Sequence, residues 1–360
     1  MAACRLAMVG SRGHYGIVLR ELPDLPEVEL VGVCAGGDTA APLLDWCSRN
    51  GRAPAQFPEY SGLLTDCRPD VVVICGPFEQ HAKMAVAAIE RGIHVYIEKP
   101  AALTFPELQA LREACAARPG TRLVAMMQYR YAPGFFTAWK LIRSGAVGDV
   151  RLINTRKSYR LGNRPAYYRD RATYGGTIPW VGSHAIDWIA WLCPVRFESV
   201  SALHSTACNG GNGSMERAAA CQFMLEGERI ATVSIDIFRP ESAPSHGDDW
   251  LRVVGTEGVL EARSHELRLI NGSTDGSQAF PLETPPRPFA DFLRYTRNEG
   301  TPLIDTQATL DVTEACLLAR QAADEGRTLR FGQQDFLRKP SARPENFGVA
   351  VDGCCREDRC

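Results

Sequence analysis

Short apolar runs alternate with segments of helical periodicity throughout residues 5–128, and this alternation restricts the fold more than any other feature of the sequence. The run at 71–76 (VVVICG) is almost entirely apolar, as is typical of a strand that is covered on both faces. Because strands that are joined by helices form right-handed crossovers, the pattern predicts a doubly wound parallel sheet. The other strands are expected at 5–10, 28–34, 94–98 and 122–128, with helices at 81–91 and, after a capping box of Thr104 and Glu107, up to 117.

The pattern changes near residue 130, where strands begin to follow one another without intervening helices. A turn at 255–258 (GTEG) joins two of them as a hairpin, and the series predicts an open, mostly antiparallel sheet. A chain of 360 residues fits two domains. We predict an N-terminal Rossmann domain at 1–128, a C-terminal α+β domain at 129–335 and a flexible tail at 336–360. The expected strands are 150–159, 198–204, 219–225, 229–238, 250–254 and 259–263, and the expected helices are 135–143, 184–192, 288–298 and 306–325.

Charge and composition exclude several classes of function. The formal net charge of -2 argues against a nucleic-acid partner that is bound through its phosphates. No apolar run approaches the roughly 20 residues that cross a bilayer, and the start (MAACRLAMVG) resembles a first strand more than a signal peptide. The 13 cysteines lack the spacing of a zinc site. The sequence therefore predicts reduced thiols, no metal, no membrane and a cytoplasmic location.

A glycine-rich turn follows the first expected strand and opens the first helix. A helix start at the end of a parallel strand offers N–H groups to a phosphate, and glycines let the backbone approach it. The spacing is one residue longer than G-x-G-x-x-G, and such turns also occur without a ligand, but the strand–turn–helix context favours a pyrophosphate site. The residues expected to bind a dinucleotide here are Gly10, Ser11, Arg12, Gly13, His14 and Tyr15.

The end of the second strand leaves the choice of dinucleotide open. Ala35 stands where an acidic residue usually binds the ribose hydroxyls, and Asp38 follows in a longer loop. Either Asp38 reaches the ribose, or the missing carboxylate admits the 2′-phosphate of NADP with Arg12 as its partner. A solvated Arg12 is the third alternative. The cofactor is therefore expected to be NAD or NADP.

Several later segments carry a family resemblance. They are GPFEQHAKMAVAAIERGIHVYIEKPAALT, MMQYRYAPGF, SGAVGDVRLI, YGGTIPWVGSHAIDW and VVGTEGVLEA, in this order. From residue 5 to about 331 the chain is similar to the glucose–fructose oxidoreductase/inositol dehydrogenase (Gfo/Idh/MocA) family. The resemblance implies hydride transfer between a nicotinamide cofactor and a sugar, polyol or related hydroxy compound. It also implies that the open sheet forms a subunit interface, so a homo-oligomer, either a dimer or a tetramer, is expected.

The resemblance assigns catalysis to Lys99 and His184. Lys99 would contact the nicotinamide ribose and the substrate hydroxyl, and a partly desolvated lysine suits acid–base chemistry. The alternative is a lysine that caps a strand end with Glu98 as its ion-pair partner. The family often has a cis peptide bond before the next proline, so Lys99–Pro100 is expected to be cis. The further residues expected to line the cofactor are Cys75, Gly76, Pro77, Phe78, His81, Glu98 and Gln128, the last in place of an asparagine.

Trp180 departs from the family pattern, because many polyol dehydrogenases carry aspartate four residues before the histidine. Either Lys99 and His184 suffice, or Trp180 stacks on a sugar face; core packing is the alternative. Asp187 either supports His184 or caps the helix. Segments 157–160 and 164–169, rich in Arg and Tyr, either hold a substrate carboxylate or hydroxyls or form a solvated basic loop. The predicted substrate contacts are Arg130, Tyr159, Trp180 and Asp187.

Two other functions fit the same motifs. One is a glycoside-cleaving enzyme that oxidises its substrate transiently, and it would turn over without added cofactor. The other is a non-catalytic protein that senses dinucleotide, since the family includes a transcriptional co-repressor. The missing aspartate slightly favours the sensor, whereas the retained Lys99 and His184 count against it.

Overall fold

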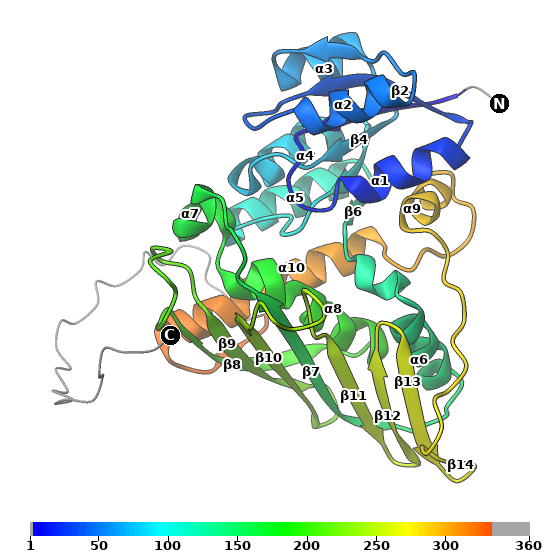
Figure 1. Cartoon of the computed structure of the whole chain (residues 1–360), viewed down its shortest axis with the longest axis vertical. Helices are drawn as coiled ribbons and strands as arrows, with labels where there is room; N and C mark the ends of the chain where they lie inside the picture. Colours follow the sequence, from blue (N-terminus) through cyan, green and yellow to red (C-terminus); the bar gives the residue numbers. More distant parts are fainter. Residues whose placement is uncertain (1–2, 333–360) are drawn as a thin grey trace, which may run out of the picture.

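The computed structural model describes residues 3–332, and its first sheet has six parallel strands in the order β3-β2-β1-β4-β5-β6 (Figure 1). Val9 at the end of β1 lies opposite Ile74 at the end of β4, where the strand order reverses. Ligands of open α/β sheets bind at such a point. The predicted doubly wound sheet is confirmed. Its strands are β1 (Cys4–Val9), β2 (Val28–Cys34), β3 (Ala55–Phe57), β4 (Val71–Ile74), β5 (His94–Ile97) and β6 (Leu123–Ala125).

Helices connect these strands, and α5 shows how the sequence sets their ends. Thr104 Oγ1 accepts from the backbone N–H of Glu107 at 3.3 Å, and Glu107 accepts from the N–H of Thr104 at 2.9 Å, so the predicted capping box is present. Helix α2, strand β3 and helix α3 were not predicted, because these short segments bury few side chains, such as Leu43 and Cys47 in α2. The helices are α1 (Gly16–Glu21), α2 (Ala41–Arg49), α3 (Tyr60–Asp66), α4 (His81–Ile89) and α5 (Phe105–Ala117).

The second sheet has nine strands in the order β14-β13-β12-β11-β7-β10-β9-β8-β15. Its pairs are antiparallel except for β7 with β10, which run parallel. The predicted open, mostly antiparallel sheet and the hairpin of β11 and β12 are therefore confirmed, while β13, β14 and β15 were not predicted. The strands are β7 (Val150–Arg160), β8 (Phe197–Ser205), β9 (Ala218–Leu225), β10 (Arg229–Arg239), β11 (Trp250–Gly255), β12 (Gly258–Arg263), β13 (Glu266–Asn271), β14 (Thr274–Asp275) and β15 (Leu329–Arg330).

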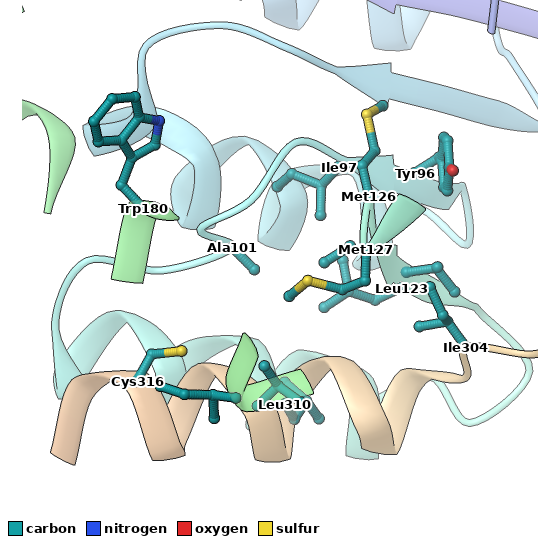
Figure 2. Packing of buried hydrophobic residues seen from close by; sticks show 14 of the residues in the cluster. Tyr96, Ile97, Ala101, Leu123, Met126, Met127, Trp180, Ile304, Leu310 and Cys316 are labelled. Carbon is teal, nitrogen blue, oxygen red and sulfur yellow. The ribbon is translucent and has the colours of Figure 1, made fainter. Parts of the chain in front are cut away.

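Helix α10 lies between the two sheets and packs against both parts of the chain (Figure 1). It contacts β8 and α8 on one side and α5 and β6 on the other. Figure 2 shows Leu310 and Cys316 of α10 below the ends of the first sheet, where Met127 and Leu123 lie. The second part also contains α6 (Pro133–Arg143), α7 (Arg171–Tyr174), α8 (Ser183–Leu192), which follows a π-helical turn at Ile178–Gly182, α9 (Pro288–Thr296) and α10 (Thr306–Glu325).

Helix α9 returns to the first sheet's side of the molecule, where Glu21 of α1 accepts hydrogen bonds from the backbone N–H groups of Phe289 and Ala290. The division at 128/129 falls between β6 and the second sheet and stays a prediction, and the predicted tail at 336–360 lies outside the described residues. Across residues 3–332, none of the helices combines the length and the apolar character that a membrane span requires.

Candidate active site

The glycine-rich loop after β1 is built around two close backbone approaches. Gly10 has a φ of +69°, and a Cβ there would lie 2.5 Å from the carbonyl oxygen of Cys75. Gly13 has a φ of +64°, and a Cβ there would lie 2.4 Å from the carboxyl carbon of Glu98. Both positions therefore require glycine. The backbone of this loop is left accessible in front of α1, which is the cradle that a dinucleotide pyrophosphate needs, and Tyr15 lies at the helix start.

Arg12 and Asp38 form an ion pair beside this loop. Arg12 Nε lies 3.4 Å from Asp38 Oδ2, and the guanidinium lies 3.9 Å from the ring centroid of Tyr167. Two buried nitrogens of Arg12 have no hydrogen-bond partner in residues 3–332, so the side chain is not a solvated loop charge. Ser11 donates its hydroxyl to Thr39 O at 2.9 Å, and Ala35 O accepts from the N–H of Asp38, which fixes the loop after β2. These groups fit the adenosine side of a dinucleotide.

The loop after β4 is tied to the segment that carries Lys99. His81 is fully buried, and its ring nitrogens lie 2.9 Å from Pro100 O and 3.1 Å from Gly76 O. Its polar atoms thus contact the backbone, and the ring positions two neighbouring loops rather than facing a ligand. Cys75 and Phe78 are buried, and Pro77 lies beside Gly37. The Lys99–Pro100 peptide bond is cis, as expected.

Glu98, His14 and Gln128 form a connected set of side chains below the glycine loop. Glu98 Oε2 accepts from the backbone N–H of His14 at 3.0 Å and lies 2.8 Å from His14 Nδ1. The other ring nitrogen of His14 contacts Gln128 Nε2. Burial alone would raise the pKa of Glu98, but the neighbouring His14 and Lys99 outweigh it and lower that pKa. Glu98 is therefore a carboxylate that fixes His14 in the predicted cofactor site.

Lys99 is buried, with 3% of its surface exposed, and its amine donates to the carbonyl oxygen of Trp180 at 2.6 Å. Glu98 Oε1 is 3.9 Å away, so the ion pair is the longer of the two contacts. Burial lowers the pKa of the Lys99 amine, Glu98 opposes this shift and Arg164 adds to it. Lys99 therefore contacts both Glu98, as the structural alternative expects, and the π-helical turn. The second of these contacts joins the two predicted catalytic segments.

His184 stands in the first turn of α8 and is buried, with 1% of its surface exposed. Neither ring nitrogen has a hydrogen-bond partner in residues 3–332. Burial lowers the pKa of His184 well below its usual value, and Lys99, Lys157 and His14 add to the effect. The ring lies edge-on to His14 with centroids 5.9 Å apart. A neutral imidazole with free nitrogens beside a lysine is a competent proton acceptor.

The side chains of Arg130 and Asp187 form an ion pair with each other, which leaves neither charge free to bind a substrate. Arg130 Nε lies 2.9 Å from Asp187 Oδ2, and both side chains are buried. Asp187 therefore neither supports His184 nor caps α8, the two roles that were predicted for it. Its carboxylate pairs with Arg130 instead. Their charged groups hold α8 against the segment after β6, so the structure favours a positioning role over the predicted substrate contact.

Trp180 lies in an aromatic group, with its ring centroid 4.3 Å from that of Tyr168 and 5.9 Å from that of Tyr174. It is 6% exposed, so packing accounts for most of its surface. Tyr159 is hydrogen-bonded through its hydroxyl to that of Tyr129 at 3.2 Å.

Sequence reasoning missed a buried ion pair behind this aromatic group. Lys157 is fully buried, and its Nζ lies 2.6 Å from Asp249 Oδ2 and 3.5 Å from the ring centroid of Tyr129. Burial lowers the pKa of Lys157 to about 7, although Asp249 opposes the shift. Tyr129 in turn packs edge-on against His184 at 4.8 Å. Asp249 had no signal in the sequence, since only the pairing of β11 with β7 brings it to Lys157.

Across residues 3–332, no group of three or more His, Cys, Asp or Glu side chains could hold a metal ion. The polar side chains of the site are amines, imidazoles and carboxylates next to the glycine-rich loop. A doubly wound sheet with this loop, followed by a second sheet whose helix supplies the histidine, defines a two-part dinucleotide-dependent oxidoreductase.

Comparison with known proteins identifies the family. Residues 4–126 match the description "Oxidoreductase family, NAD-binding Rossmann fold", and residues 135–261 match "GFO/IDH/MocA C-terminal domain". The chain belongs to the Gfo/Idh/MocA family of oxidoreductases, and its first part is an NAD-binding Rossmann fold.

Three relatives illustrate the range of similarity. A solved structure from Thermotoga maritima, assigned as an oxidoreductase, is 38% identical, with a TM-score of 0.86, over 91% of this chain and 99% of that one. D-glucoside 3-dehydrogenase of Escherichia coli is 25% identical over 91% of this chain and 84% of its own length. Inositol 2-dehydrogenase of Salmonella typhimurium is 32% identical over 48% of this chain and 49% of its own length, so that match spans about half of the curated relative.

Proposed function

We propose that this protein transfers a hydride between NAD(P) and a hydroxyl-bearing carbon of a sugar, polyol or related compound, with Lys99 and His184 as the acid–base pair. One observation carries the proposal. The Lys99 amine is held at the carbonyl oxygen of Trp180, four residues before His184, whose buried ring nitrogens have no partner in the described part of the chain. The ring of His184 lies edge-on to His14 of the dinucleotide loop, and Glu98 lies next to both His14 and Lys99.

The chain's own groups account for the proton. When bound, the nicotinamide supplies the hydride acceptor. His184, kept neutral by burial and by the neighbouring cations, accepts the hydroxyl proton as the C–H bond breaks and the C=O bond forms. Lys99 donates a hydrogen bond to the same oxygen and stabilises the charge that develops there. Because both groups are buried, water does not compete with these contacts.

A substrate panel tests the proposal. Sugars and polyols are supplied with NAD and with NADP, and nicotinamide absorbance is followed for the wild type, Lys99→Ala and His184→Ala. We expect turnover with at least one compound and its loss in both variants. Normal turnover in both variants would remove the assigned roles, and cofactor-free turnover of a glycoside would instead support the glycoside-cleaving alternative. The retention of both buried groups argues against the sensor.

The open sheet supports a homo-oligomer as part of this proposal. Leu203 is 70% exposed on β8, Phe238 is 47% exposed on β10 and Ile270 is 50% exposed on β13. Exposed apolar side chains spread over one sheet are typical of an association surface. Light scattering after gel filtration would give the oligomer size. A cytoplasmic location is likewise proposed.

A further inference from the structure

Arg164 carries a charge that the described residues leave uncompensated. It follows β7 in the segment that runs past the site, and it is partly buried. It forms no ion pair with a carboxylate in residues 3–332; one nitrogen donates to Arg160 O at 3.1 Å, and its buried Nε has no hydrogen-bond partner there. A partly desolvated guanidinium without a carboxylate partner is a binding group for an anion, so an anion from outside the chain would stabilise this arrangement.

The position of Arg164 links it to the substrate side of the site. Its guanidinium carbon lies 5.0 Å from the ring centroid of Trp180 and 5.7 Å from that of Tyr168. It is close enough to lower the pKa of Lys99, whose amine bonds to the same tryptophan. The guanidinium therefore lies beside Trp180, near the amine of Lys99.

The cations around the site are not all paired with carboxylates. Lys99 has Glu98 within 3.9 Å, and Lys157 has Asp249 within 2.6 Å. Arg164 is the cation of this group for which the described residues offer no carboxylate. The tyrosines that surround it, Tyr159, Tyr167 and Tyr168, are neutral hydroxyl groups whose pKa values burial raises. Of these three cations, Arg164 is therefore the one without a compensating carboxylate in the described residues.

We propose that the substrate is a carboxylate-bearing sugar or polyol, such as a uronate or an aldonate, and that Arg164 binds its carboxylate while Lys99 and His184 act on a hydroxyl. The substrate assignment rests on the proposed function. A planar guanidinium binds a carboxylate through two parallel hydrogen bonds, and Arg164 presents such a group beside Trp180. A dinucleotide phosphate is the other source of an anion, but Arg12 already stands at the cradle that receives it.

The test compares matched pairs of compounds in the full-length protein: D-glucose with D-glucuronate, and D-galactose with D-galacturonate, with glucose 6-phosphate as a further anion. Binding is measured by calorimetry in saturating NADH, where a hydroxy compound cannot be oxidised, and turnover is measured separately with NAD and NADP.

We expect the acids to bind about tenfold to a hundredfold more tightly than their neutral partners, the range of a charge-assisted hydrogen bond. Arg164→Gln should abolish this advantage by weakening the binding of the acids much more than that of the neutral sugars. Arg164→Lys should restore part of it.

Arg169→Gln is the matched control, because it removes an exposed charge from the same segment and should leave the preference for acids intact. Three results would overturn the proposal: equal binding of acids and neutral sugars by the wild type, tighter binding of the phosphate than of either acid, or an equal loss for both classes in Arg164→Gln.

Weaker NADH binding by Arg164→Gln without any sugar would assign the anion to the cofactor instead. Arg164-dependent binding of acids without any NAD(P)H formation would uphold this inference and refute the proposed dehydrogenase activity. Oxidation of neutral sugars with no preference for the acids would uphold the proposed dehydrogenase activity and refute this inference.

Discussion

The amine of Lys99 and the carbonyl oxygen of Trp180 lie 2.6 Å apart, which joins the end of β5 to the turn that precedes His184. A substrate hydroxyl would compete with this carbonyl for the same amine. Lys99→Ala should therefore lower kcat by about a hundredfold or more, the usual contribution of a positioned acid–base group. Steady-state kinetics and a dinucleotide titration check this, with Lys83→Ala as the control because Lys83 is exposed on α4. A kcat as low in the control, or an unchanged kcat in Lys99→Ala, would contradict the role.

His184 sets the pH dependence that we expect for alcohol oxidation. Its pKa is lowered well below 6.5, first by burial and then by Lys99, Lys157 and His14. The neutral base is thus present at and above pH 6.5, and kcat/KM should fall only as the pH drops through the lowered pKa. Removing a neighbouring cation by Lys157→Met should move this acidic limb to higher pH. A limb near pH 6.5 in the wild type, or no shift in the variant, would argue that another group accepts the proton.

Lys157 should also give the protein a distinct pH dependence of stability. Its pKa is about 7 in the folded state, so between about pH 7 and the ordinary lysine value of about 10.4 the unfolded chain holds a proton that the folded chain has released. The free energy of unfolding should therefore rise with pH in this window, relative to Lys157→Met, by at most about 1.4 kcal/mol per pH unit.

Urea unfolding of the wild type and Lys157→Met from pH 6 to pH 9 measures this difference. The exposed Lys83→Met is the control and should run parallel to the wild type. If the wild type and Lys157→Met kept a constant difference across the window, Lys157 would not be a desolvated lysine.

The sequence predicted both sheets, because each depends on local pattern. The apolar run at 71–76 and the capping box at Thr104 and Glu107 are read from neighbouring residues, and both appear as β4 and α5. The short β3 and α3 were missed because they bury few side chains and carry little periodicity.

The polar contacts of the site were less predictable, because they depend on register. Asp249 meets Lys157 only since Trp250 pairs with Arg156 across β11 and β7. Arg130 meets Asp187 only because the segment at Gln128–Tyr131, after β6, lies against α8. Residue types alone suggested substrate contacts for these two charges, and packing instead pairs them with each other. The family motifs predicted Lys99 and His184 as the acid–base pair, whereas the lack of a carboxylate partner for Arg164 in residues 3–332 can be seen only in the structure.

The Arg130–Asp187 pair should matter for stability. Removing one partner leaves a buried charge, so Arg130→Met is expected to lower the free energy of unfolding by about 3 to 5 kcal/mol. The double variant Arg130→Met/Asp187→Leu should recover part of this loss, because no unpaired charge remains. Denaturant unfolding of the single and double variants measures both effects. Additive losses in the double variant would mean that the two charges do not depend on each other.

Asp38 should decide between the two dinucleotides, because its carboxylate lies in the loop after β2 and pairs with Arg12 at 3.4 Å. A 2′-phosphate placed near this carboxylate would be repelled, and Arg12 would first have to leave its partner. Asp38→Asn should therefore improve the affinity for NADPH relative to NADH by about tenfold, or about 1.4 kcal/mol. Fluorescence titration of both cofactors measures the ratio, with Asp66→Asn as an exposed control on α3. The same change for both cofactors would place Asp38 away from the 2′ position, and a stronger preference for NADH would show that Arg12 depends on Asp38 to hold its position.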